Sequence, residues 1–108
     1  MLKSNSEFNG GLIMDLKCEQ MDTLFNVILS LKTVDECYAF FEDLCTVKEI
    51  RDMSQRFQAA IKLDEGINYL QIVKEAHLST ATISRVSRCL NYGSGGYRIA
   101  LDRMKEGK

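Results

Sequence analysis

Apolar residues recur at helical spacing along most of the chain, beginning near Glu19. The first apolar stripe consists of Met21, Leu24, Phe25, Ile28 and Leu31. Residues three and four apart lie on one face of an α-helix, so this spacing predicts an amphipathic helix. The chain contains no proline, the main helix breaker, and long uninterrupted helices are therefore permitted.

Two threonines, Thr33 and Thr46, predict the starts of the next two helices. Each is followed three residues later by a glutamate, which is the pattern of a capping box. In this device the threonine hydroxyl accepts a first-turn N–H, and the glutamate accepts the N–H of the cap itself. We expect one helix to end near Cys45 and the next to run from Val47 to Gly66, a glycine suited to a left-handed stop. The core positions predicted for these two helices are Val34, Cys37, Phe41, Leu44, Ile50, Met53, Phe57, Ala60 and Ile61.

A pair of short helices around a tight turn is predicted over residues 69–90. Asn68 is a candidate cap for a helix from Tyr69 to Ala76, the sequence His77-Leu-Ser79 interrupts the period, and a further helix covers Thr80–Leu90. Glycine-rich residues 91–96 then lead to a last amphipathic helix. Core candidates in this part are Leu70, Ile72, Val73, Ala76, Ile83, Val86, Leu90, Tyr97, Ala100, Leu101 and Met104, and we also interpret the Tyr92 ring as packing.

These elements predict an all-α fold of six helices without a sheet. Residues 1–17 have no sustained period and are expected to form a poorly ordered leader, with 18–108 as a single helical domain. Two helices joined by a short turn are common in all-α proteins, so the function of such a pair depends on the residues that its second helix exposes.

The second helix of the pair carries small polar residues followed by arginines. Small leading side chains let a helix approach the major groove, while hydroxyls and arginines contact base edges and phosphates. The N–H groups of the first turn also favour a phosphate. The candidate DNA-binding residues are Lys74, Ser79, Thr80, Ala81, Thr82, Ser84, Arg85 and Arg88, and Arg98 is a further candidate for a phosphate contact.

Charge is distributed unevenly along the 108 residues. The net charge of −1 excludes a uniformly basic protein that coats nucleic acid. Residues 1–54 hold 5 basic and 10 acidic side chains, residues 55–79 hold 3 of each, and residues 80–108 hold 6 and 2. Basic charge is therefore concentrated in the predicted DNA-reading helix and the segment that follows it, as expected of a phosphate-binding face.

Several classes of protein are disfavoured by what the chain contains. Its four cysteines match no zinc spacing, and a single histidine, His77, offers too few nitrogen ligands, so we expect no metal site. No serine, cysteine or carboxylate is paired in the sequence with a residue that could act as its general base, which argues against an enzyme. No apolar stretch is long enough to cross a bilayer, and we expect a cytoplasmic protein. The main alternative to DNA binding is a helical protein-interaction module that docks through its acidic N-terminal helices.

Three segments resemble the YerC/YecD branch of the Trp repressor-like proteins. They are Ser79-Thr-Ala-Thr-Ile-Ser-Arg-Val-Ser-Arg-Cys-Leu-Asn-Tyr-Gly93, Met53-Ser-Gln-Arg-Phe57 and Glu36-Cys-Tyr-Ala-Phe-Phe-Glu-Asp-Leu-Cys-Thr46. The resemblance extends from about Leu24 to Met104. It implies a helix-turn-helix transcription regulator that works as an intertwined homodimer, in which the N-terminal helices of the two chains interlace. Such a dimer presents two reading heads to a pseudo-palindromic operator on double-stranded DNA and acts as a repressor.

The resemblance also implies a site for a small-molecule effector. In Trp repressor the co-repressor tryptophan lies between the third helix and the recognition helix, and Arg56, Arg85, Thr46 and Cys89 fall at its contact positions. Cys89 replaces a serine, and a thiol is a weaker hydrogen-bond partner than a hydroxyl, which disfavours tryptophan. For Arg56 we favour a solvated charge or an ion pair over a ligand contact. His77 replaces a turn glycine, where we expect a positive φ with some strain.

Overall fold

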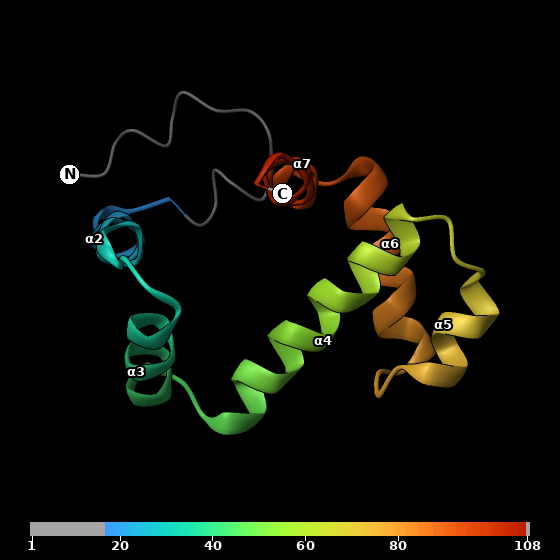
Figure 1. Cartoon of the computed structure of the whole chain (residues 1–108), viewed down its shortest axis with the longest axis horizontal. Helices are drawn as coiled ribbons and strands as arrows, with labels where there is room; N and C mark the ends of the chain where they lie inside the picture. Colours follow the sequence, from blue (N-terminus) through green and yellow to red (C-terminus); the bar gives the residue numbers. More distant parts are fainter. Residues whose placement is uncertain (1–16, 108) are drawn as a thin grey trace. The chain divides into compact units, whose positions relative to one another are not determined.

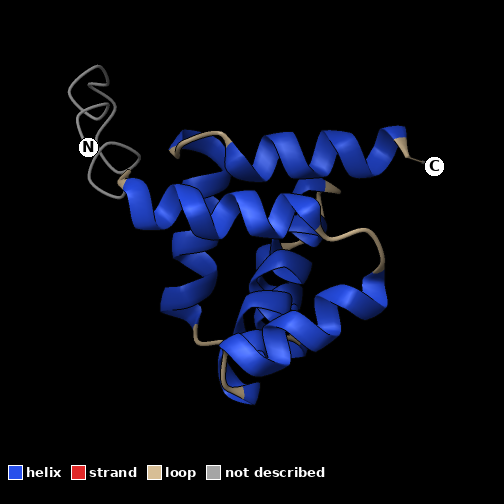
Figure 2. Ribbon diagram, turned by 90° about the vertical axis from the view of Figure 1, so that its left-hand side faces the viewer, coloured by secondary structure: helices blue, strands red, loops and turns tan. Residues whose placement is uncertain are grey.

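The computed structural model describes residues 17–107, and every regular element in that range is an α-helix (Figures 1 and 2). The helices are α2 (Glu19–Ser30), α3 (Val34–Leu44), α4 (Val47–Asp64), α5 (Tyr69–Glu75), α6 (Thr80–Tyr92) and α7 (Gly96–Glu106). The predicted all-α fold of six helices is confirmed for this part of the chain. The expected leader lies outside the described residues, except for Lys17. None of the described helices is long and apolar enough to cross a membrane.

The start of α3 follows the predicted capping pattern with one change. The Thr33 Oγ1 accepts a hydrogen bond from the N–H of Glu36 at 3.0 Å. The Glu36 carboxylate accepts the N–H of Lys32 at 2.8 Å, so the predicted return bond to the N–H of Thr33 is wrong. With Thr33 in an extended conformation (φ −135°, ψ 161°), it is the preceding N–H that reaches the carboxylate. Both bonds satisfy donors near the helix start that would otherwise lack partners.

The connection between α4 and α5 has the predicted stop and start signals. Gly66 has a φ of 83°, a left-handed conformation that a residue with a Cβ adopts only at a cost. The N–H of Gly66 donates to the carbonyl of Leu63, and the N–H of Ile67 donates to that of Lys62, both at 3.1 Å. The Asn68 side chain then caps α5 by accepting two first-turn N–H groups.

Helix α6 continues two residues beyond the predicted end at Leu90. Asn91 remains helical, and its side-chain amide donates to the carbonyl of Ser87 at 2.9 Å. The helix ends at Gly93, where an added Cβ would collide with the carbonyl of Cys89. A residue with a side chain at this position would therefore require the end of α6 to shift.

The chain divides into two compact units, Met1–Thr46 and Val47–Lys108. In the first unit, no residue of α2 or α3 is buried. The prediction that Val34 and Leu44 are core residues is wrong for the single chain, since they are 71% and 49% exposed. The periodicity correctly predicts apolar helix faces, but two short helices do not by themselves provide the layers needed to cover them.

The core of the second unit forms where α5 and α6 pack against α4. Its buried members are Ala59, Ala60, Ile72, Ile83 and Val86. The adjacent alanines of α4 allow close approach of the other helices, because they project little volume from the α4 backbone. The predicted core positions that are instead exposed are Met53, Leu70, Ala100 and Met104.

Helix α7 is attached to this core by one buried leucine and one ring contact. Leu101 is 1% exposed, and Tyr97 stacks on Phe57 of α4 with ring centroids 6.3 Å apart. The packing interpretation is confirmed for Tyr97. It is wrong for Tyr92, which is 86% exposed because it lies in the last turn of α6, beyond the buried positions of that helix.

Candidate nucleic-acid interface

Helices α5 and α6 form a helix-turn-helix with a shared apolar core. Ile72 of α5 and Ile83 and Val86 of α6 are buried together, and Ala76 and Leu78 of the turn pack against them. The predicted positive φ at His77 is wrong, because no non-glycine residue among those described has a positive φ. Extended residues at the two ends of the turn, Ala76 (ψ 154°) and Ser79 (ψ 158°), reverse the chain without a left-handed residue.

The start of α6 is held by three hydrogen bonds. Ser79 Oγ accepts the N–H of Thr82 at 3.1 Å, and the two hydroxyls lie 3.0 Å apart in a second hydrogen bond. The phenol of Tyr69 donates to the carbonyl of Thr80 at 3.2 Å, which joins the starts of α5 and α6. Ser79 and Thr82 are therefore already engaged in positioning the helix that the sequence predicts to read DNA.

The outward face of α6 carries the remaining candidates. Thr80, Ala81, Ser84, Arg85 and Arg88 are all exposed, while the opposite face contains the fully buried Ile83 and Val86. Because the inner face is fixed in the core, the orientation of the outer face is fixed as well. Small residues lie at its start and arginines follow, in the order expected for a helix that enters the major groove.

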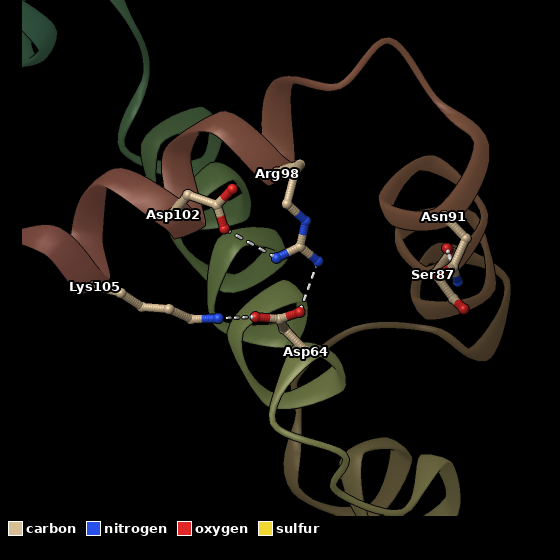
Figure 3. A network of polar contacts seen from close by, with 6 residues as sticks. All are labelled: Asp64, Ser87, Asn91, Arg98, Asp102 and Lys105. Carbon is tan, nitrogen blue, oxygen red and sulfur yellow. Dashed lines mark hydrogen bonds and ion pairs between the residues drawn. The ribbon is translucent and has the colours of Figure 1, made fainter.

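Basic residues of α5, α6 and α7 differ in whether they form ion pairs. Lys74, Arg85 and Arg88 are exposed and have no ion-pair partner among residues 17–107. Arg98 and Lys105 of α7 instead contact the Asp64 carboxylate of α4 at 2.7 and 2.9 Å (Figure 3). Among the described basic residues of α5, α6 and α7, those without an ion-pair partner are thus Lys74, Arg85 and Arg88, together with Arg103 of α7.

The network around Asp64 also joins two helices that are distant in sequence. Arg98 makes a second ion pair with Asp102 at 3.3 Å (Figure 3). Hydrogen bonds from Arg98 and Lys105 lower the pKa of Asp64 to about 2, and the hydrogen bond with Asp64 raises the pKa of Arg98. Arg98, which the sequence offered as a phosphate contact, is therefore engaged in fastening α7 to α4.

The predicted effector residues are distributed over both units. Thr46 is the last residue of the first unit, whereas Arg56 is half-buried on α4 and Cys89 is half-buried on α6. Arg85 lies one turn before Cys89. No hydrogen bond or ion pair within the described range links Arg56 to Arg85 or Cys89. Arg56 contributes, after Lys48, to a lowered pKa of Asp52. The interpretation of Arg56 as a helix charge and not a ligand contact stays a prediction.

Sequence reasoning missed two residues that position this surface, Tyr69 and Asp64. Tyr69 reaches a carbonyl 11 residues away, and Asp64 holds a lysine 41 residues away. No local pattern marks either contact. A partial signal for Tyr69 was its place at the first position of α5, directly after the cap. Among the residues that the structure describes, no group of three or more His, Cys, Asp or Glu side chains could hold a metal ion.

Comparison with known proteins gives consistent matches. Residues 19–105 match the family described as Trp repressor protein. The chain is 56% identical over 91 residues to the uncharacterized protein YerC of Bacillus subtilis (strain 168), covering 84% of this chain and 88% of that protein. It is also similar to two crystal structures. A TrpR-like protein from Eubacterium eligens ATCC 27750 has a TM-score of 0.79 and 50% identity, covering 84% of this chain and 94% of that one. A candidate Trp repressor from Staphylococcus aureus has a TM-score of 0.82 and 48% identity, covering 87% and 94%.

Proposed function

The chain belongs to the Trp repressor protein family, and from this we propose that it is a sequence-specific DNA-binding transcription regulator. The observation that carries the proposal is the two-sided character of α6. Its inner face is buried with Ile83 and Val86, and its outer face presents Arg85 and Arg88 without ion-pair partners in the described chain.

The outer face supports a division of roles among the residues of α5 and α6. Thr80, Ala81 and Ser84 are small enough for close approach to base edges, and Arg85 follows them at the depth of the groove. Arg88 and Lys74 would contact phosphates at the flanks. Ser79 and Thr82 act mainly by holding the first turn of α6, whose free N–H groups favour a phosphate.

We propose that the working form is a homodimer that acts as a repressor in the cytoplasm. The supporting observation is the large exposed apolar surface of α2 and α3, which includes Phe25 (51% exposed), Leu29 (81%), Val34 (71%) and Tyr38 (64%). Monomeric proteins rarely leave such surfaces open to water. A second copy would cover them and would place two copies of α6 on a pseudo-palindromic operator.

Sedimentation equilibrium tests the dimer. Leu29→Asp should shift the protein to monomer, because it would bury a carboxylate in the interface, while Thr23→Asp, exposed on a different face of the same helix, adds the same charge as a control. A wild-type protein that remained monomeric at all concentrations would refute the dimer, as would equal effects of the two substitutions.

The DNA proposal is tested by affinity for duplex DNA across salt concentration. Each phosphate contact contributes about −0.9 to the slope of log affinity against log salt. If Arg85 contacts a phosphate, Arg85→Ala in both subunits reduces the slope by about 1.8. If it reads a base, affinity falls by about tenfold or more for the matched site. Arg103→Ala removes the same charge from α7 and is the control. Equal losses in the two variants would contradict the assignment of α6.

A protein-interaction module without DNA binding remains the second candidate, favoured by the same exposed apolar surface on α2 and α3. It predicts a protein partner and no salt-sensitive affinity for DNA, so the salt titration separates the two functions.

We also propose Thr46, Arg56, Arg85 and Cys89 as the contacts of a small co-repressor. Calorimetry with tryptophan tests this set, and Cys89→Ser should tighten binding because a hydroxyl accepts an ammonium donor better than a thiol does. No heat with either protein would count against tryptophan.

A further inference from the structure

Tyr92, in the last turn of α6, has the most exposed of the large apolar and aromatic side chains among residues 17–107, at 86%. Within that range its hydroxyl has no hydrogen-bond partner and its ring stacks on no other ring. The neighbouring Asn91 amide, in contrast, turns back to its own helix and donates to the Ser87 carbonyl at 2.9 Å (Figure 3). Contacts within the described chain therefore do not account for an aromatic ring at the end of α6.

The Tyr92 side chain lies on the face of α6 that is proposed to meet DNA. Residues three and four positions apart share one face of a helix. One such row on α6, exposed throughout, consists of Ala81, Arg85, Arg88 and Tyr92. The buried residues Ile83 and Val86 lie on the opposite side. The surface that α6 presents to DNA thus extends beyond Arg88 to the tyrosine.

The place of Tyr92 along this row determines which part of the duplex it can reach. At ~1.5 Å per residue, Tyr92 lies about 16 Å beyond Ala81 along the helix axis. The major groove is only about 12 Å wide. When the first turn of such a helix contacts base edges, its last turn is therefore level with the sugar-phosphate backbone. Tyrosine side chains are among the groups that bind phosphate oxygens in protein–DNA complexes.

The segment that follows Tyr92 leaves room for a DNA backbone. Residues 93–96 are three glycines and Ser94, and all four are exposed. A Cβ added at Gly95 or Gly96 would meet no protein atom within 4 Å, so these positions border open space. Residues 93–96 therefore add little bulk next to Tyr92 that could hold a DNA strand away from it.

We propose that the Tyr92 hydroxyl donates a hydrogen bond to a phosphate oxygen of the DNA backbone, at the point where α6 leaves the major groove. This contact rests on the proposed DNA-binding function and adds a residue to it. It fixes the position of α6 on the duplex without reading sequence. A neutral hydroxyl releases no counterion from DNA, so its contribution to affinity does not change with salt concentration, unlike that of an arginine.

Binding of the full-length protein to duplex DNA across salt concentration tests the contact. The probes are a mixed-sequence duplex and the duplex enriched by selection from random sequences. Tyr92→Phe removes one oxygen, and because hydrogen bonds to charged groups are among the stronger ones, it should weaken binding to both duplexes about tenfold. The slope of log affinity against log salt should stay unchanged, as should the urea unfolding curve, since the side chain is exposed.

Tyr97→Phe is the matched control. It removes the same hydroxyl from the ring that stacks on Phe57, and it should leave DNA affinity unchanged. A neutral methylphosphonate, placed at each phosphate of the enriched duplex in turn, locates the partner of Tyr92. At one phosphate of each half-site the wild-type protein should lose affinity and Tyr92→Phe should lose none, which is the coupling expected of two groups in contact.

Four results would overturn the contact and leave the proposed function standing. They are equal affinities of wild type and Tyr92→Phe, a loss confined to the enriched duplex, which would indicate a base contact, equal losses in the two tyrosine variants, and identical methylphosphonate profiles for wild type and Tyr92→Phe. Failure of the wild-type protein to bind either duplex at any salt concentration would instead strike the proposed function, and the Tyr92 contact with it.

Discussion

Helix α5 offers a sharp test of the packing that supports the helix-turn-helix, because two large aliphatic residues on it have opposite environments. Ile72 is 1% exposed in the core, and Leu70 is 68% exposed. Ile72→Ala removes three carbon atoms from a site closed by α4 and α6. The lost transfer free energy is about 2.4 kcal/mol at ~0.8 kcal/mol per carbon. The cavity left behind raises the expected loss in unfolding free energy to about 3–4 kcal/mol.

Leu70→Ala removes a similar volume from a solvated position and should change the unfolding free energy by less than about 0.5 kcal/mol. Ile72→Val, which removes one carbon, should cost about 1 kcal/mol. The assay is urea unfolding followed by far-UV circular dichroism at one fixed protein concentration, since a dimer's stability depends on concentration. Equal losses for the two alanine variants, or a loss below about 1 kcal/mol for Ile72→Ala, would refute the described core.

Three further outcomes are expected. Asp64→Asn should lower the free energy of unfolding at neutral pH. Because the folded-state pKa of Asp64 is about 2, below the usual 3.8, the difference in stability between wild type and variant should disappear as the pH falls from about 4 through 2. Acid-unfolding curves of the two proteins measure this. Tyr69→Phe removes the bond to the Thr80 carbonyl and should cost about 0.5–1.5 kcal/mol in urea unfolding; unchanged amide exchange at the start of α6 would argue against this link. Thr33→Ala removes the cap of α3 and should cost about 1 kcal/mol in the same assay, and no loss would mean that the cap bond is not formed in solution.

The elements that sequence predicts well are those specified by neighbouring residues. The cap at Asn68 and the stop at Gly66 each depend on bonds within a few positions, so their residue types are sufficient to locate helix ends. The same is true of the buried positions Ile83 and Val86, whose spacing matches one helix face. The family resemblance carried by residues 79–93 then favours a DNA-binding regulator, which spacing alone left open against a protein-interaction module.

The features that sequence did not predict depend on partners far along the chain. Val34 and Leu70 have the spacing of core residues, but periodicity identifies an apolar face without specifying what covers it. The contact of Asp64 with Lys105 spans 41 residues. The net charge of residues 80–108 therefore did not reveal that Arg98 and Lys105 form ion pairs with this carboxylate. His77 has no positive φ because the extended residues Ala76 and Ser79 reverse the chain on either side of it. The prediction of a positive φ came from comparing the residue type at one position, and that comparison contains no information about the neighbouring backbone.

The central claim, that paired copies of α6 read a specific DNA sequence, is tested most directly by selection of bound sites from random duplexes with the full-length protein. The account predicts a pseudo-palindrome whose half-site centres lie about one helical turn apart, with enrichment lost in Arg85→Ala and retained in Arg103→Ala. Recovery of no enriched sequence from the wild-type protein, or of the same sequence with Arg85→Ala, would contradict it.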